Sequence, residues 1–112
     1  TQVMLAAKKR PTAILAATVM SGSGALKALH AAGVRVPEDM SVMTIHDLPI
    51  SEMLQPPLTA MRFPLQEMGV VAANGLIDLL EGKVETVACV LPHEGLTVRS
   101  STASPRARAA RA

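Results

Sequence analysis

The first 45 residues contain two short apolar runs that flank a segment with helical spacing. The runs Ile14–Ala17 and Ser41–Ile45 have the length and continuity of strands that are covered on both faces of a sheet. Between them, Ser21 or Ser23 can cap a helix, and Gly33 can end it by adopting a left-handed conformation. A strand, a helix and a strand of this size form a right-handed βαβ unit with a parallel sheet. The helix would bury four residues, Ala25, Leu26, Leu29 and Ala32.

Further elements are expected on both sides of this unit. Residues 1–10 have the pattern of a helix end, and Pro11 would stop that helix. After the unit, Leu58–Phe63 has the pattern of a third strand. Pro64 then begins a long helix that Gly82 ends, because a proline at the first helical position loses no hydrogen bond. The apolar face of this helix would consist of Leu65, Met68, Ala72, Leu76, Leu79 and Leu80.

The last third of the chain is expected to be less regular. Gly69 and Gly75 lie inside the long helix, where each glycine costs about 1 kcal/mol relative to alanine, so we expect close packing there. Val87–Leu91 and Leu96–Val98 have the pattern of two short strands. From Ser100 onward the small, polar and Ala/Arg residues offer nothing to bury, and this segment is predicted to be disordered.

Composition limits the chain to one ordinary domain of 112 residues, 49% of them hydrophobic. The net charge of +2 comes from the tail, because without Arg106, Arg108 and Arg111 the chain has eight basic and nine acidic residues. A nearly neutral body gives no electrostatic footprint for DNA. No apolar run reaches the roughly 18 residues that a membrane span requires. A single cysteine excludes a disulfide framework, and the near-absence of aromatic residues argues against a stacking platform for single-stranded nucleic acid.

One segment imitates a targeting signal. Lys8–Arg10 precedes the apolar stretch Thr12–Met20 and the small residues Ser21–Ala25, which is the order found in secretory signals. We interpret the segment as a helix end followed by a buried strand, because regular structure continues without a break after it.

Four residues follow the two strands of the predicted βαβ unit. Thr18 and Val19 come after the first strand, and His46 and Asp47 come after the second. In open α/β sheets, ligands bind outside the carboxyl ends of the strands, so these four residues form the candidate ligand-binding site. His46 and Asp47 could alternatively be the acid–base pair of a small α/β hydrolase, although adjacent residues at a strand end point to opposite sides.

The remaining candidates for chemistry carry weaker signals. His30, His46 and His93 lack the spacing of metal ligands, so no metal site is predicted. His30 is expected to be partly exposed and His93 to lie in a bend. Cys89 has apolar neighbours and is expected to be a buried, inert thiol. Ser21–Gly24 could cradle a phosphate, but a plain capping turn is the simpler interpretation.

Seven segments follow one another at characteristic spacings: Arg10–Ile14, Ala25–Leu29, Gly33–Asp39, Pro56–Thr59, Glu67–Gly69, Leu79–Gly82 and Leu91–Thr102. Together they resemble the lactose-repressor (LacI) family of bacterial transcription regulators over residues 1–104. The resemblance implies an α/β fold with a parallel sheet in a three-layer αβα arrangement. It would be the C-terminal portion of a two-lobed domain of the periplasmic-binding-protein-like type I class.

The resemblance also implies an organisation and a function. Residues 1–57 would belong to the C-terminal lobe, residues 58–90 would cross to the N-terminal lobe, and residues 91–104 would return, followed by a disordered tail at 105–112. A helix-turn-helix upstream of this sequence would bind the operator DNA. The protein would be a cytoplasmic homodimer without cofactor or enzymatic activity, controlled by a small sugar-like effector, with Met53 and Leu54 at the dimer interface.

The sequence departs from the family pattern at the candidate site. Where the family usually has Asn-Asp after the first strand, this chain has Thr18 and Val19, and His46 stands where the family usually has an aspartate. A carboxylate only accepts hydrogen bonds, whereas an imidazole can donate one or carry a positive charge. This difference favours an acidic effector, such as a sugar acid or a sugar phosphate, over a neutral sugar.

Two alternatives to a regulator remain open at the level of sequence. One is a periplasmic sugar-binding protein of the same fold, and the other is the small hydrolase that would use His46 and Asp47. A helix-turn-helix upstream of Thr1 would indicate a regulator, whereas a signal peptide there would indicate the periplasmic protein.

Overall fold

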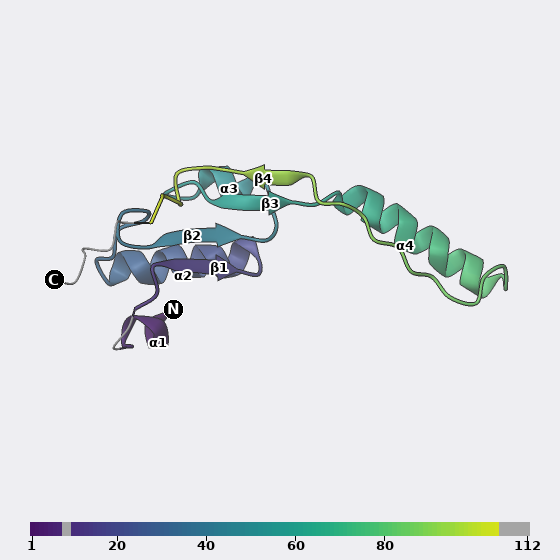
Figure 1. Ribbon diagram of the computed structural model, residues 1–112, viewed down its shortest axis with the longest axis horizontal. Helices are drawn as coiled ribbons and strands as arrows, with labels where there is room; N and C mark the ends of the chain where they lie inside the picture. Colours follow the sequence, from purple (N-terminus) through teal and green to yellow (C-terminus); the bar gives the residue numbers. More distant parts are fainter. Residues whose placement is uncertain (8–9, 106–112) are drawn as a thin grey trace.

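The chain forms a four-stranded sheet from which a helical arm extends (Figure 1). The computed structural model describes residues 1–7 and 10–105, and its longest dimension is 65 Å. The strands are β1 (Ala13–Ala16), β2 (Ser41–Thr44), β3 (Thr59–Arg62) and β4 (Gly95–Thr97). The helices are α1 (Gln2–Leu5), α2 (Val19–Ala31), α3 (Ile50–Met53) and α4 (Leu65–Leu80).

The strands lie in the order β1-β2-β3-β4. β1 pairs with β2 and β2 with β3 in parallel, while β4 runs antiparallel to β3. The predicted βαβ unit is therefore confirmed, and so are the third strand and the second of the two late strands, each within about two residues of its expected bounds. The predicted helix end before Pro11 is present as α1, whereas Lys8 and Lys9 lie outside the described residues.

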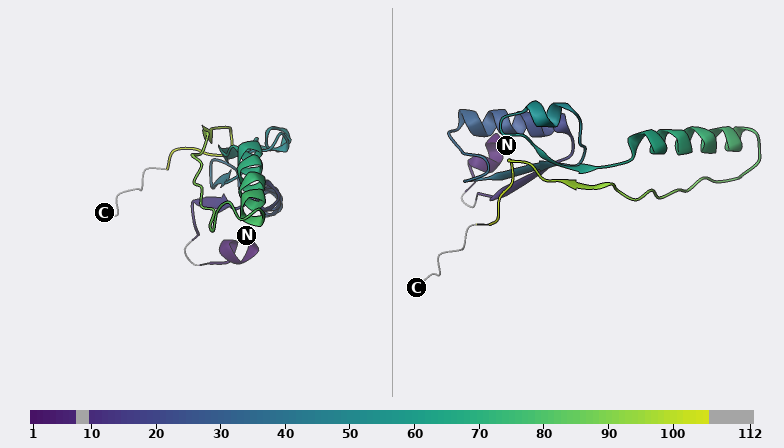
Figure 2. Two further views of the ribbon diagram at one scale, coloured as in Figure 1. Left: turned by 90° about the vertical axis from the view of Figure 1, so that its right-hand side faces the viewer. Right: turned by 90° about the horizontal axis from the view of Figure 1, so that it is seen from above.

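Helices α2 and α3 cover the same face of the sheet (Figure 2). The core lies between this helical layer and the strands, where the side chains of Leu29, Val42 and Leu58 are fully buried. Leu15 of β1 is 63% exposed, and the described helices leave it uncovered. The expectation that β1 is covered on both faces is therefore wrong for the described residues, which supply one helical layer of the expected three-layer arrangement.

Helix α2 begins one turn earlier than its predicted cap. Thr18 is the N-cap: its hydroxyl accepts a hydrogen bond from the backbone N–H of Ser21 at 3.2 Å, and the Ser21 hydroxyl accepts one from the backbone N–H of Thr18 at 3.0 Å. The extended backbone of Thr18 brings its side chain over the first turn, which Ser21 and Ser23, being helical themselves, cannot do. At the other end Gly33 has φ +67° as predicted, but Ala32 is exposed.

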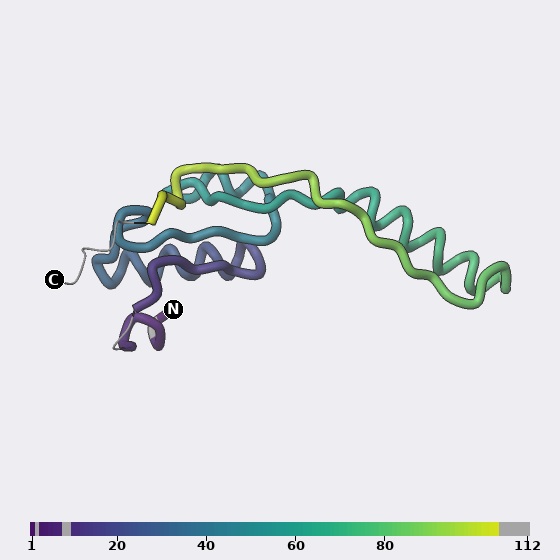
Figure 3. Tube along the Cα trace, in the orientation of Figure 1, coloured from purple at the N-terminus to yellow at the C-terminus, as the bar shows by residue number. Residues whose placement is uncertain are grey.

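Helix α4 extends away from the sheet, and the chain returns beside it to β4 (Figure 3). Most of its predicted apolar face is open to solvent: Leu76 is 57% and Leu80 is 79% exposed. Gly75 is buried, and a Cβ atom there would lie 2.7 Å from Cγ1 of Val87, which confirms the close packing expected at this glycine. A Cβ at Gly69 would meet nothing within 4 Å, so that expectation is wrong at Gly69.

Residues 87–91 form no strand, contrary to the prediction. Their neighbour is α4, whose backbone groups are already used within the helix, so it offers no edge with which a strand could pair. Gly82, at φ +69°, ends the helix as predicted. None of the described helices is long and apolar enough to cross a lipid bilayer.

The segment after β4 is ordered through Ser101, although nothing beyond Ser100 was expected to be buried. Ser101 is fully buried and lies between β2 and β3. Its carbonyl accepts a hydrogen bond from the N–H of Val42 at 2.8 Å, and its hydroxyl donates to the Val42 carbonyl at 2.6 Å. The same hydroxyl accepts a hydrogen bond from the N–H of Thr59 at 2.8 Å. The N–H of Ala103 donates to the Ser41 hydroxyl at 3.1 Å, so the expectation of disorder from Ser100 is wrong as far as Ala103. Residues 106–112 of the predicted tail lie outside the described part.

The contact between α2 and β2 makes a prediction about two glycines in α2. A Cβ at Gly22 would lie 2.5 Å from Cγ2 of buried Thr44 and 3.1 Å from Cδ1 of Leu58, whereas a Cβ at Gly24 would meet nothing within 4 Å. We expect Gly22→Ala to lower the free energy of unfolding by about 1–2 kcal/mol through overpacking. The matched variant Gly24→Ala should raise it by about 0.5–1 kcal/mol through helix propensity. Urea unfolding followed by circular dichroism measures both, and equal effects of the two variants would contradict the close contact.

Candidate functional site

Three strand ends meet at one edge of the sheet. Because β1, β2 and β3 are parallel, their carboxyl ends all lie on the side from which α4 leaves (Figure 1). The N–H of Ile45 donates to the carbonyl of Ala16 at 3.1 Å, so Thr18 and His46 follow neighbouring strand ends that are hydrogen-bonded to each other. Phe63 follows β3 at the same edge. We call the edge formed by Thr18, His46 and Phe63 the ligand edge.

The rings of His46 and Phe63 are in contact at the ligand edge. Their centroids are 5.9 Å apart and their planes form an angle of 64°, which is an edge-to-face arrangement. Both residues are half-buried. Phe63 is the single Phe in a chain without Trp or Tyr, and the sequence reasoning did not assign it a role. The available signal was its position directly after the third predicted strand.

Thr18 and Val19 differ in what they present to a ligand. The Thr18 side chain is exposed at the helix start, but its hydroxyl is engaged with Ser21 in the cap. The Val19 side chain is 2% exposed and belongs to the core, so it cannot reach a ligand at the edge. In the first turn of α2 the early backbone N–H groups have no partner within the helix, and they point toward this edge. The backbone of this turn is therefore better placed for a ligand than the Val19 side chain.

Asp47 is held by Arg99, a residue that the sequence analysis did not connect with it. Nη1 and Nη2 of Arg99 donate to the two carboxylate oxygens of Asp47 at 2.8 Å and 3.0 Å, and both side chains are nearly buried, at 12% and 11% exposure. Nη1 also donates to the Leu58 carbonyl at 2.7 Å, and Nη2 to Glu52 at 3.2 Å. Both oxygens of Asp47 are thus already engaged. A cavity of about 390 Å³ lies beside this pair.

The charge state of Asp47 follows from these contacts. Burial disfavours its charged form, but hydrogen bonds from Arg99 and Thr97 and the positive charge of Arg99 outweigh that effect, so the pKa of Asp47 lies below its usual value. The hydrogen bond with Asp47 in turn raises the pKa of Arg99. Asp47 is therefore a carboxylate at neutral pH and bound to Arg99 rather than arranged as an acid–base partner of His46.

The backbone around His46 is held from several sides. The Thr44 hydroxyl donates to the His46 carbonyl at 2.9 Å. Two residues after His46, the N–H of Leu48 donates to the hydroxyl of Ser51 at 3.3 Å, and the N–H of Ser51 donates to the Leu48 carbonyl at 2.8 Å. Residues 45–48, which we call the His46 turn, are therefore fixed between β2 and α3.

The other single side chains considered in the sequence, those of His30, His93 and Cys89, are exposed. His30 is exposed on α2, as expected, and Nδ1 of exposed His93 accepts a hydrogen bond from the N–H of Gly95 at 3.0 Å. Cys89 is exposed, so the expectation of a buried thiol is wrong, because residues 83–94 run along the open arm without covering one another. In the described part of the chain, no three His, Cys, Asp or Glu side chains are grouped so that they could hold a metal ion.

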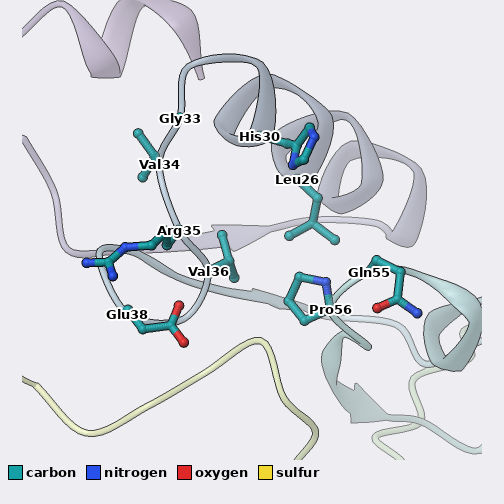
Figure 4. A pocket seen from close by; sticks show the side chains of 9 residues that line it. All are labelled: Leu26, His30, Gly33, Val34, Arg35, Val36, Glu38, Gln55 and Pro56. Atoms are coloured by element: carbon teal, nitrogen blue, oxygen red, sulfur yellow. The ribbon is translucent and has the colours of Figure 1, made fainter.

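A second cavity, of about 380 Å³, lies at the far end of α2 (Figure 4). Apolar Leu26 and Pro56 and polar His30, Glu38 and Gln55 are among the residues that line it. None of the four residues predicted to bind a ligand lines it. The ligand edge and this cavity are therefore separate features, at opposite ends of the same helix.

Residues 1–102 match the model of the periplasmic binding protein-like domain family. The chain is 36% identical over 104 residues to the lactose operon repressor of Rhizobium radiobacter. The matched stretch covers 93% of this chain and 91% of that protein. A LacI transcriptional regulator from Bacillus cereus superposes with a TM-score of 0.83 at 30% identity, over 93% of this chain and 37% of that one. The chain belongs to the LacI-type periplasmic-binding-protein-like family.

A LacI-family regulator from Arthrobacter, solved in complex with lactose, superposes with this LacI-type domain at a TM-score of 0.64 and 38% identity. The match covers 82% of this chain and 36% of that one. The domain spans between 26% and 30% of the length of several other curated relatives, which are transcription regulators. The resemblance seen in the sequence and the α/β fold class are thus confirmed, and the matched region is the C-terminal effector-binding part of those proteins.

The lowered pKa of Asp47 makes the stability of this LacI-type domain sensitive to acid. A carboxylate with a depressed pKa stabilises the folded state above its unfolded pKa of about 3.9, and this contribution is lost as the pH falls through the lowered value. We expect Asp47→Asn to lower the free energy of unfolding at neutral pH by about 1–3 kcal/mol. The same variant should unfold with a shallower dependence on pH in the acid range.

The matched control is Glu94→Gln. Glu94 forms an ion pair with Arg62 at 3.1 Å, but both side chains are about half exposed. Such a pair contributes at most about 1 kcal/mol, so the control should keep most of the stability at neutral pH. Urea unfolding across a pH series measures both variants. An acid dependence in Asp47→Asn that equals that of the unmodified protein would contradict the assignment.

Proposed function

We propose that this chain is the effector-sensing part of a LacI-type transcription regulator. The observation that carries the proposal is the family match over residues 1–102, combined with the convergence of three strand ends at one edge. A sugar-like effector bound there would change the relative populations of two lobe arrangements. An upstream helix-turn-helix would thereby gain or lose affinity for operator DNA. Such a regulator acts in the cytoplasm, where the DNA is, and needs neither a catalytic residue nor a cofactor.

The two alternatives receive less support. The curated relatives are transcription regulators rather than periplasmic carriers, which favours the first proposal over a periplasmic sugar-binding protein. A hydrolase would need Asp47 to orient His46, but both carboxylate oxygens of Asp47 accept hydrogen bonds from Arg99. The pairing with Arg99 therefore favours a role for Asp47 in holding the site together over a role in proton transfer.

The exposed arm supports the proposal that the chain crosses between two lobes. Residues 58–90 would enter the N-terminal lobe, and residues 91–104 would return to the C-terminal lobe formed by residues 1–57. In agreement with this division, α4 leaves the sheet at the ligand edge (Figure 3). It carries exposed apolar side chains such as Leu76 and Leu80. An apolar helix face of this length requires a covering layer in the complete protein. The ligand edge would then face the cleft between the lobes.

The chemistry of the ligand edge favours an acidic effector. His46 stands where the resemblance to the LacI family implies an aspartate, so the fixed negative charge of that aspartate is absent from this position. The first backbone N–H groups of α2 and the positive end of its dipole point to the same edge. The imidazole of His46 and these groups together would accommodate a carboxylate or a phosphate on a sugar. Thr18 contributes chiefly by starting the helix at this place, and Asp47 by holding the turn.

We expect the protein to bind a sugar acid or sugar phosphate more tightly than the matched neutral sugar. His46→Asp should reverse this order, since one added negative charge at the edge changes the ratio of the two affinities by about tenfold or more. Isothermal titration calorimetry of the full-length protein with the matched pair of sugars measures the ratio. The control is His30→Asp, which makes the same change of charge at the far end of α2, away from the ligand edge. A neutral sugar preferred by the unmodified protein would contradict the proposal.

The outer surface of the helical layer is the proposed dimer interface. Met53 in α3 is 77% exposed, and Met20 in α2 is 75% exposed on the same layer (Figure 2). Leu54, the other residue expected at the interface, instead packs partly against the core cluster. Met53 is therefore the better probe, because its substitution does not disturb the core. Exposed methionines on one helical layer are suited to an apolar contact between two copies.

We expect Met53→Arg to convert the full-length dimer to monomers, because it would bring two like charges together at a symmetric contact. Met53→Leu should leave the dimer intact, since the apolar surface is preserved. Sedimentation velocity over a concentration series distinguishes the two outcomes. Met53→Arg that sediments as the unmodified protein does would place the interface elsewhere.

A further inference from the structure

Arg99 joins the C-terminal segment of the chain to the turn that carries His46. Its guanidinium contacts Asp47 in the His46 turn, the carbonyl of Leu58 before β3, and Glu52 in α3. Its backbone is fixed as well, because the N–H of Arg99 donates to the Thr59 hydroxyl at 2.9 Å. The guanidinium is thus anchored at its base and spans three separate segments.

The other contacts of the His46 turn are backbone or short hydroxyl contacts on either side of it. Thr44 holds the His46 carbonyl, and Ser51 holds Leu48. The side chain of Asp47, directly after His46, is held by Arg99, which lies two residues beyond β4. Because Asp47 receives two parallel hydrogen bonds, both its position and its orientation are fixed. Because His46 directly precedes Asp47, the direction of the His46 side chain is fixed as well.

We infer that Arg99 is a positioning residue for the effector site: through Asp47 it fixes the His46 turn so that the imidazole lies against Phe63 at the ligand edge. This inference rests on the proposed function, because it assigns Arg99 a role in effector choice. The hydrogen bonds of Arg99 go to Asp47, Leu58, Glu52 and Thr59, none of which belongs to the ligand edge as defined above. It acts on the selectivity for acidic over neutral sugars by holding His46 within the narrow range of positions that a binding site requires.

The bidentate geometry gives a sharp test, because lysine keeps the charge but cannot form two parallel hydrogen bonds. The test variant is Arg99→Lys. The matched control is Arg35→Lys, because Arg35 also forms two hydrogen bonds with a carboxylate, that of Asp39, at 2.8 Å and 3.0 Å. Arg35 is 66% exposed and lies beyond the far end of α2. The two variants therefore make the same chemical change at and away from the His46 turn.

Two measurements on the full-length protein are needed, both under conditions where each variant is folded. Hydrogen–deuterium exchange with peptide resolution reports on the amides of residues 45–52 without any ligand. We expect them to exchange about tenfold faster in Arg99→Lys and to be unchanged in Arg35→Lys. Calorimetry with the matched acidic and neutral sugars should show the ratio of their affinities falling about tenfold in Arg99→Lys alone.

The outcomes separate this inference from the proposed function. Faster exchange together with a reduced affinity ratio supports the positioning role. Unchanged exchange in Arg99→Lys overturns it, whatever the sugars do. Faster exchange with an unchanged ratio overturns the role in effector choice while leaving the proposed function standing. Failure of the unmodified protein to bind any sugar of either class overturns the proposed function, and the inference with it.

Discussion

The sheet depends on a set of hydrogen bonds between segments far apart in the sequence. β2 and β3 pair at Met43 with Thr59 and at Thr44 with Ala60. Next to these pairs, Ser101 satisfies backbone groups of Val42 and Thr59. Without it, polar groups of two central strands would be buried without partners, which costs about 1–3 kcal/mol for each group. The position of β3, and of everything that follows it, is therefore set by residues near the end of the described chain.

The same segment connects the framework to the ligand edge. Arg99 lies two residues before Ser101, and its backbone pairs with the Thr59 side chain while its guanidinium reaches Asp47. One short stretch thus closes the sheet at the amino ends of the strands and fixes a turn at their carboxyl ends. This arrangement explains why the small domain contains the nearly buried ion pair between Arg99 and Asp47. An exposed ion pair such as Arg35–Asp39 contributes little to the free energy of unfolding.

Features determined by neighbouring residues could be predicted from the sequence. The positive φ at Gly33 and Gly82, the parallel pairing of β1 with β2 and the placement of His46 after a strand all follow from local pattern. Long-range contacts could not be predicted in this way. Ser101 lies in a segment with the composition of a disordered tail, and its burial results from hydrogen bonds to Val42 and Thr59, which periodicity does not reveal. Arg99 has no local signal that links it to Asp47, which lies 52 residues earlier.

The dependence of the sheet on Ser101 has a consequence for how the protein is made. Val42 and Ser101 are separated by 59 residues. A ribosome that adds about 5–20 residues per second needs about 3–12 s to synthesise that stretch. For part of this time β3 has been made as well, and the backbone groups of Val42 and Thr59 that Ser101 pairs are still open. The sheet can be completed only after Ser101 has left the exit tunnel, so the domain is most exposed to aggregation and to chaperone binding during its own synthesis.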